Sequence, residues 1–210
     1  RILNGAHTSC IPISFLYGLD TVMEMMDDEK MGKYVEQLVY EEIIPSMDYP
    51  EDMLKSFAKD VLERFRNPYI KHYLLSILLN STSKFKARVL PSLLQYANQK
   101  GELPTKIVLS LACLLWVYRD GVVEGNIFHS SRAKGEFDLQ DDDFALDILN
   151  GAWRTHGNNT LEFAKAALRA EKIWGMDLNE VPSLTEKVAE ELKVLVQGKL
   201  ADRITEVVGG

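Results

Sequence analysis

The stretch TKIVLSLACLLWVYR, from Thr105 to Arg119, decides the fold, because it is apolar on nearly every face of a helix. A helix that meets solvent needs a polar face, so a helix that is apolar all round is buried among others. The longest apolar run, Ile107 to Tyr118, is interrupted only by Ser110 and is too short to cross a bilayer, which takes about 20 residues. We therefore expect this stretch to be the central and most buried helix of the chain.

Apolar residues recur three and four positions apart in most of the remaining sequence, as in helices with one buried face. Pro45 and Pro68 follow two such segments, Gly101 and Gly175 stand where helix caps are expected, and Pro91 should kink a helix or start a new one. The segments predicted to be helical are Asp28–Ile44, Glu51–Phe65, Ile70–Leu79, Phe85–Gln99, Thr105–Arg119, Asp142–Thr155, Thr160–Trp174 and a last helix from near Pro182 to Val207.

Strands are not expected, since no stretch alternates apolar and polar residues as a half-buried strand does. The segment from Gly121 to Gln140 holds three glycines and scattered charges, and it is predicted to be an exposed loop. The predicted fold class is therefore all-α.

The composition excludes several classes of protein. A net charge of −7 over 210 residues argues against a nucleic-acid surface, which needs clustered Lys and Arg. Cys10 and Cys113 both lie in apolar segments, so we expect two buried free thiols in a reducing compartment. We see no signal peptide, no membrane span and no His and Cys cluster at metal-ligand spacing, and we expect a cytoplasmic protein without a metal site.

Familiar catalytic and cofactor motifs are also missing. No G-x-G-x-x-G follows a strand, and neither a phosphate-binding G-x-x-x-x-G-K-[ST] loop nor a G-x-S-x-G nucleophile turn is present. The run Asp141–Asp143 precedes a helical pattern, so we interpret it as a cap that meets the positive end of the helix dipole. His129 and His156 are expected to be solvated, and the core is expected to hold Trp116, Trp153 and Trp174.

Asn4 and His7 are the first candidates for chemistry. They are three residues apart, so on a helix both side chains point to one face. An Asn amide can donate a hydrogen bond to a reacting oxygen, and a neutral His can orient a hydroxyl or accept a proton. The alternative is that Asn4 caps the helix and His7 is a polar neighbour.

The opening RILNGAHT resembles the K-x-x-x-x-N-x-x-H signature of the long-chain mannitol dehydrogenase family. The resemblance implies that Asn4 helps to hold the reacting oxygen and that His7 helps to position the substrate. The signature's Lys, the general acid/base of the family, would lie two residues before Arg1. Since the chain also lacks an initiator Met, we expect it to be part of a longer polypeptide.

Three further segments, Tyr40–Pro45, Arg64–His72 and Leu79–Phe85, resemble the tagaturonate reductase (altronate oxidoreductase) branch of that family. The resemblance implies that residues 1–210 form the helical C-terminal substrate domain. It implies that an N-terminal Rossmann-like domain, absent from this chain, binds most of the NAD. The implied partners are therefore that domain and a small sugar-acid substrate.

The same resemblance implies a substrate-contacting Lys at Lys84, although a solvated surface Lys is the alternative reading from residue type alone. An ammonium can donate to a substrate oxygen or pair with a carboxylate. Mannitol enzymes commonly carry Arg eight residues earlier, where this sequence has Ser76, which argues against a plain polyol. Lys71 and His72 are further candidates for substrate binding, whereas nearby polar residues of the helix break, Arg64 and Asn67, are interpreted as structural.

Together these features suggest the substrate side of an oxidoreductase that interconverts tagaturonate and altronate. No metal is expected, because a Lys transfers the proton in this family. One alternative is a fructuronate reductase or another polyol or sugar-acid dehydrogenase of the same family. An alternative of another class is a helical interaction module without catalytic activity.

We predict that this chain alone does not bind NAD tightly, because it has no glycine turn to hold the pyrophosphate. Titration calorimetry with NAD should give no micromolar dissociation constant. Micromolar binding by the isolated chain would contradict the prediction.

Overall fold

The computed structural model describes residues 1–67, 69, 71–130 and 136–209. The first half holds α1 (Ile2–Tyr17), α2 (Val22–Asp27), α3 (Glu29–Gln37), the π-helical η1 (Leu38–Ile43), the 3-10 turn η2 (Ile44–Ser46), α4 (Glu51–Phe65), α5 (Leu74–Leu78), α6 (Ser81–Arg88) and α7 (Leu90–Lys100). The second half holds α8 (Thr105–Val117), β1 (Gly121–Glu124), β2 (Ile127–Ser130), β3 (Phe137–Gln140), α9 (Asp143–His156), α10 (Thr160–Leu168), α11 (Glu171–Trp174), the 3-10 turn η3 (Leu178–Glu180), α12 (Leu184–Val196) and α13 (Leu200–Gly209).

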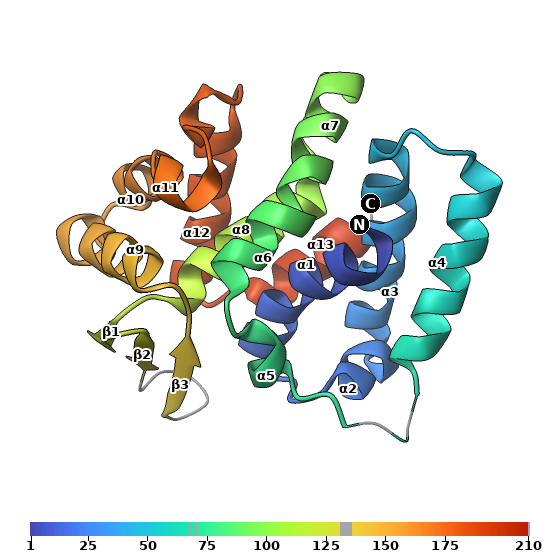
Figure 1. Cartoon of the computed structure of the whole chain (residues 1–210), viewed down its shortest axis with the longest axis horizontal. Coiled ribbons are helices and arrows are strands. Elements are labelled where there is room, and N and C mark those ends of the chain that lie inside the picture. Colours follow the sequence, from blue (N-terminus) through green and yellow to red (C-terminus); the bar gives the residue numbers. More distant parts are fainter. Residues whose placement is uncertain (68, 70, 131–135, 210) are drawn as a thin grey trace.

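Helix α8 runs through the middle of the molecule, as Figure 1 shows. Every residue from Lys106 to Val117 is buried, and the helix packs against α1 and α12. The Ser110 hydroxyl, its one polar interruption, donates to the Ser9 carbonyl of α1 at 2.7 Å. The prediction of a buried central helix is confirmed.

The helices lie in two groups on either side of α8 (Figure 1). One group holds α3 and α4 at one edge, with α1 between them and α8, and the other holds α9 to α12. Helix α13 returns across the molecule to pack against α3. The predicted mostly helical fold class is confirmed.

The predicted loop between Gly121 and Gln140 is wrong over its described residues, because these form a three-stranded antiparallel sheet in the order β1-β2-β3. The two-residue Gly125-Asn126 turn, with Gly125 at φ +60°, joins β1 to β2. A Cβ atom at Gly121 would lie 2.3 Å from the Phe128 ring, so only glycine allows that ring to cover the hairpin. Gly135 lies outside the described residues.

Most helix boundaries follow the predicted punctuation. Pro91 starts the new helix α7, and Gly101 ends that helix in the left-handed conformation at φ +71°. The predicted last helix is two helices, because Gly198 at φ +68° separates α12 from α13. Only residues 74–78 of the predicted helix from Ile70 are helical, and Pro68 and Ile70 lie outside the described residues.

The amino end of α8 is capped by a side chain from another element. Glu42, in the π-helical segment η1, accepts hydrogen bonds from the backbone amides of Lys106 at 2.8 Å and Ile107 at 2.9 Å. Glu41 next to it pairs with the Lys106 ammonium at 2.9 Å. The first amides of a helix have no partner within it, and Glu42 satisfies the two that belong to the buried residues Lys106 and Ile107.

We predict that Glu42 makes stability fall as pH rises. Burial raises its pKa from 4.5 to about 7, against the opposing effect of the two amide hydrogen bonds. The folded state therefore holds this proton more tightly, and the stabilisation present below pH 4.5 is lost as pH rises through about 7. Relative to Glu42→Gln, wild type should lose up to about 3 kcal/mol of unfolding free energy across this window.

Urea unfolding at several pH values measures this difference. Glu63→Gln, which removes an exposed carboxyl from α4, is the matched control. A wild-type-minus-Gln difference that stays constant between pH 4.5 and 7 would show that burial does not dominate at Glu42.

Candidate functional site

Asn4 and His7 lie on one face of α1, near its start. The helix begins at Ile2, so Asn4 is its third residue rather than its cap, and the alternative reading of Asn4 as a cap is wrong. Its side chain is exposed and forms no hydrogen bond with any described residue, while its backbone carbonyl accepts from the Thr8 hydroxyl at 2.8 Å. The amide is therefore free to bond to another molecule.

His7 is held by stacking. Its ring lies 3.9 Å from the ring of Phe65, centroid to centroid, with 18° between the planes. Within the described part of the chain, its buried Nε2 atom has no hydrogen-bond partner. Burial lowers the pKa of His7 to about 4, with the positive charges of His72 and Arg88 contributing. The ring is thus neutral at neutral pH, with one nitrogen still able to bond.

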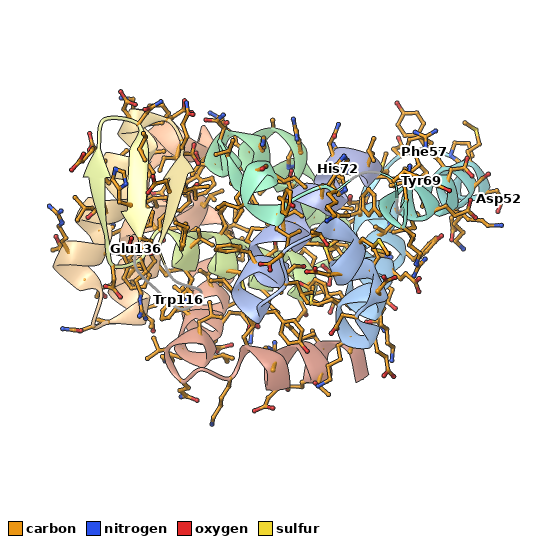
Figure 2. The ribbon with its side chains drawn as sticks, turned by 90° about the horizontal axis from the view of Figure 1, so that it is seen from below. Asp52, Phe57, Tyr69, His72, Trp116 and Glu136 are labelled. Carbon is orange, nitrogen blue, oxygen red and sulfur yellow. The ribbon has the colours of Figure 1, made fainter. Side chains whose placement is uncertain are left out.

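His72, in the segment between α4 and α5, acts on His7 through its charge. An antiparallel bridge between Thr21 and Tyr73 holds this segment, and the His72 carbonyl accepts from the Val22 amide at 3.0 Å. The imidazole is exposed, and Figure 2 shows it at the edge of the molecule away from the three-stranded sheet. Lys71 is exposed too, and no contact among the described residues joins its side chain to Asn4 or His7.

Lys84 lies on α6, which packs against α1. Its ammonium is half-buried and donates to the Ile77 carbonyl of α5 at 2.9 Å. Burial lowers the pKa of Lys84, Arg88 lowers it further, and Asp141 opposes both. No carboxylate of the described residues lies within ion-pair distance of this ammonium.

Arg88 follows Lys84 by one helical turn and ends α6 beside the start of α1. A Cβ atom added to Gly5 would lie 3.1 Å from the Arg88 carbonyl oxygen, so glycine permits this close approach of the two helices. Helix α6 packs against α1, and we call five residues on or beside these two helices the α1–α6 cluster: Asn4, His7, His72, Lys84 and Arg88.

Asp141 is buried at the start of α6, a position that the sequence did not reveal. It is 1% exposed, and its carboxylate accepts from the Thr82 hydroxyl at 2.7 Å, the Thr82 amide at 3.1 Å and the Tyr118 hydroxyl. The acidic run does precede a helix as interpreted, with Asp142 at the N-cap position of α9 and Asp143 in its first turn, but Asp141 caps the start of α6 instead. Asp142 is the residue before α9, and its side chain accepts no capping hydrogen bond.

Other predicted residues lie away from the cluster or have plain structural contacts. Arg64 is exposed on α4, and Asn67 accepts from the Tyr69 amide at 3.0 Å in a local turn. His129 is not freely solvated, since it is half-buried and pairs with Asp138 at 2.7 Å. His156, half-buried, ends α9, and the side chains confirmed as buried are Cys10, Cys113, Trp116, Trp153 and Trp174.

The larger grooves lie elsewhere. One of about 930 Å³ is bounded by α9, α10 and α12, and another of about 830 Å³ by α7, α8 and α12. The residues of the α1–α6 cluster line neither of these two grooves. Within the described ranges, no three His, Cys, Asp or Glu side chains could hold a metal ion, and no helix is long and apolar enough to cross a membrane.

The mostly helical fold and the residues of the α1–α6 cluster can be compared with those of known proteins. The chain belongs to the mannitol dehydrogenase C-terminal domain family, whose model matches residues 1–196. It is 44% identical over 200 residues to altronate oxidoreductase of Pectobacterium carotovorum, covering 93% of this chain and 40% of that protein. It is 42% identical over 189 residues to altronate oxidoreductase of Bacillus subtilis, covering 90% and 36%.

A solved structure shares the fold. Pseudomonas fluorescens mannitol 2-dehydrogenase, in a ternary complex with NAD and D-mannitol, superposes with a TM-score of 0.80 at 18% sequence identity. The match covers all of this chain and 39% of that one. The chain thus spans about 40% of the length of the curated relatives it matches.

We predict that His7 stays neutral across the physiological range because it is buried among positive charges. NMR titration of the histidine ring signals should give a midpoint of about 4 for the resonance that disappears in His7→Asn. His156→Asn, outside the cluster, is the matched assignment control. A midpoint near 6.5 would show that His7 meets bulk water.

Proposed function

We propose that the chain is the substrate-side domain of an NAD-dependent oxidoreductase that interconverts tagaturonate and altronate. The observation that carries the proposal is the α1–α6 cluster. In it an amide and a neutral imidazole of α1 accompany two cations of α6, neither of which forms an ion pair with a carboxylate of the described residues. In a chain of net charge −7, such a local concentration of positive charge suits a small anion. The names of the relatives support a sugar acid as that anion.

In this proposal Asn4 and His7 act on the reacting end of the substrate. The Asn4 amide donates to the oxygen on which charge builds, and its exposed position on α1 leaves it free to do so. The unpartnered Nε2 of His7 bonds a neighbouring hydroxyl and orients it without adding charge. Lys84, already fixed to the Ile77 carbonyl, keeps further N–H groups for substrate oxygen.

Bound NAD would exchange hydride with the substrate carbon. Among the described residues, no strand leads through a glycine turn into a helix that could hold its pyrophosphate. We therefore assign NAD binding mainly to an N-terminal domain of the complete enzyme. That domain would also cover the α1–α6 cluster, which is open to solvent at Asn4 and His72. The mannitol 2-dehydrogenase that shares this fold is itself a complex with NAD, which supports NAD as the cofactor.

We predict that Asn4→Ala in the complete enzyme lowers kcat by on the order of 10²–10³ and changes KM little. The amide bonds most strongly as charge develops, so its loss affects the transition state more than the bound substrate. Since Asn4 lies within α1 and caps nothing, the melting temperature should not fall.

Asn98→Ala is the matched control, because Asn98 is also an exposed helical Asn, on α7 and outside the cluster. Steady-state kinetics and melting curves on both variants decide the matter. A lower melting temperature with near-normal kcat for Asn4→Ala would remove Asn4 from the catalytic residues.

A further inference from the structure

Three cationic side chains of α6 point to different places. Lys84 is tied to the Ile77 carbonyl, which uses one of its three N–H groups. Lys86 lies on another side of the helix, where its Cε is 3.0 Å from the position that a Gly175 Cβ would take. Arg88 stands on the side of Lys84, four residues on, where neighbouring side chains of a helix meet.

Arg88 lies on the same side of α6 as Lys84, and its side chain has no partner among the described residues. Its guanidinium forms no hydrogen bond or ion pair with them, while other arginines of the chain, such as Arg66 and Arg203, pair with glutamates. It is half-buried, and its backbone is fixed against Gly5 of α1. Its charge also lowers the pKa of both His7 on α1 and Lys84 on α6.

We propose that Arg88 binds the carboxylate of the substrate and so makes the site select sugar acids over neutral sugars. A guanidinium offers paired N–H groups that match the two oxygens of a carboxylate, whereas an ammonium offers a single point of charge. Lys84 then binds a substrate hydroxyl, Asn4 and His7 bind the reacting end of the substrate, and Arg88 binds its carboxylate end. This assignment rests on the proposed function and specifies its substrate class.

The test compares an acid with its neutral analogue in the complete enzyme. The kcat/KM is measured for altronate and for the hexitol in which the carboxylate is replaced by a primary alcohol. Arg88→Met should lower kcat/KM for altronate by on the order of 10–10²-fold, the usual effect of losing a charged hydrogen bond, and should change that for the hexitol less than about twofold. Arg88→Lys should lie between Arg88→Met and wild type.

Lys86→Met is the matched control, since it removes a cation from the same helix on another side. It should leave the ratio of the two kcat/KM values unchanged. Added methylguanidine should partly restore altronate turnover to Arg88→Ala, a rescue that a merely structural role would not give.

Either of two results would overturn the assignment while the proposed function stands. One is an equal loss of kcat/KM for acid and hexitol in Arg88→Met. The other is a wild-type ratio of the two kcat/KM values in both Arg88→Met and Arg88→Lys. Wild-type enzyme that oxidises the hexitol and leaves altronate unchanged would instead contradict the proposed function itself.

Discussion

Shielding α8 from water on all sides constrains the rest of the molecule. Each of its faces needs an apolar neighbour, and α1 and α12 supply two of them. Its first amides also need acceptors inside the core, and Glu42 supplies them from a segment that widens from an α-helix into a π-helix. Because α1 lies along α8, its orientation is fixed, with Gly5 against Arg88 of α6 and His7 against Phe65 of α4.

The buried central helix and the helical fold class can be predicted from the sequence. One apolar stretch has to be buried, and apolar residues spaced three and four apart around it are typical of helices. The sheet cannot be read in this way, because its strands are only four residues long. The Gly125-Asn126 pair is the one local signal for it, since such pairs are typical of two-residue hairpin turns. Long-range partners, such as Glu42 with α8 or Asp141 with α6, leave no local pattern.

The candidate site, too, can be predicted from the sequence only in part. The family resemblance identifies Asn4, His7 and Lys84, and the structure adds which of them share a face. In the sequence Arg88 is one of several cations near Lys84. The spacing of these residues does not show which of them form bonds in the folded chain. The sequence favours a cap at Asp141 because acidic runs before helices usually are caps, and only the folded chain reveals Thr82 and Tyr118 around it.

The contact between Gly5 and the Arg88 carbonyl sets the width of the site. Even a single methyl group at position 5 would meet that oxygen at 3.1 Å, tighter than most real contacts, so the two helices would have to part slightly. Such a step would move Asn4 and His7 together, relative to Lys84, without touching any of them. The absence of a side chain at position 5 therefore sets the distance between the groups of α1 and those of α6 that would bind the two ends of a substrate. Substrates one carbon longer or shorter should test the same distance from the ligand's side.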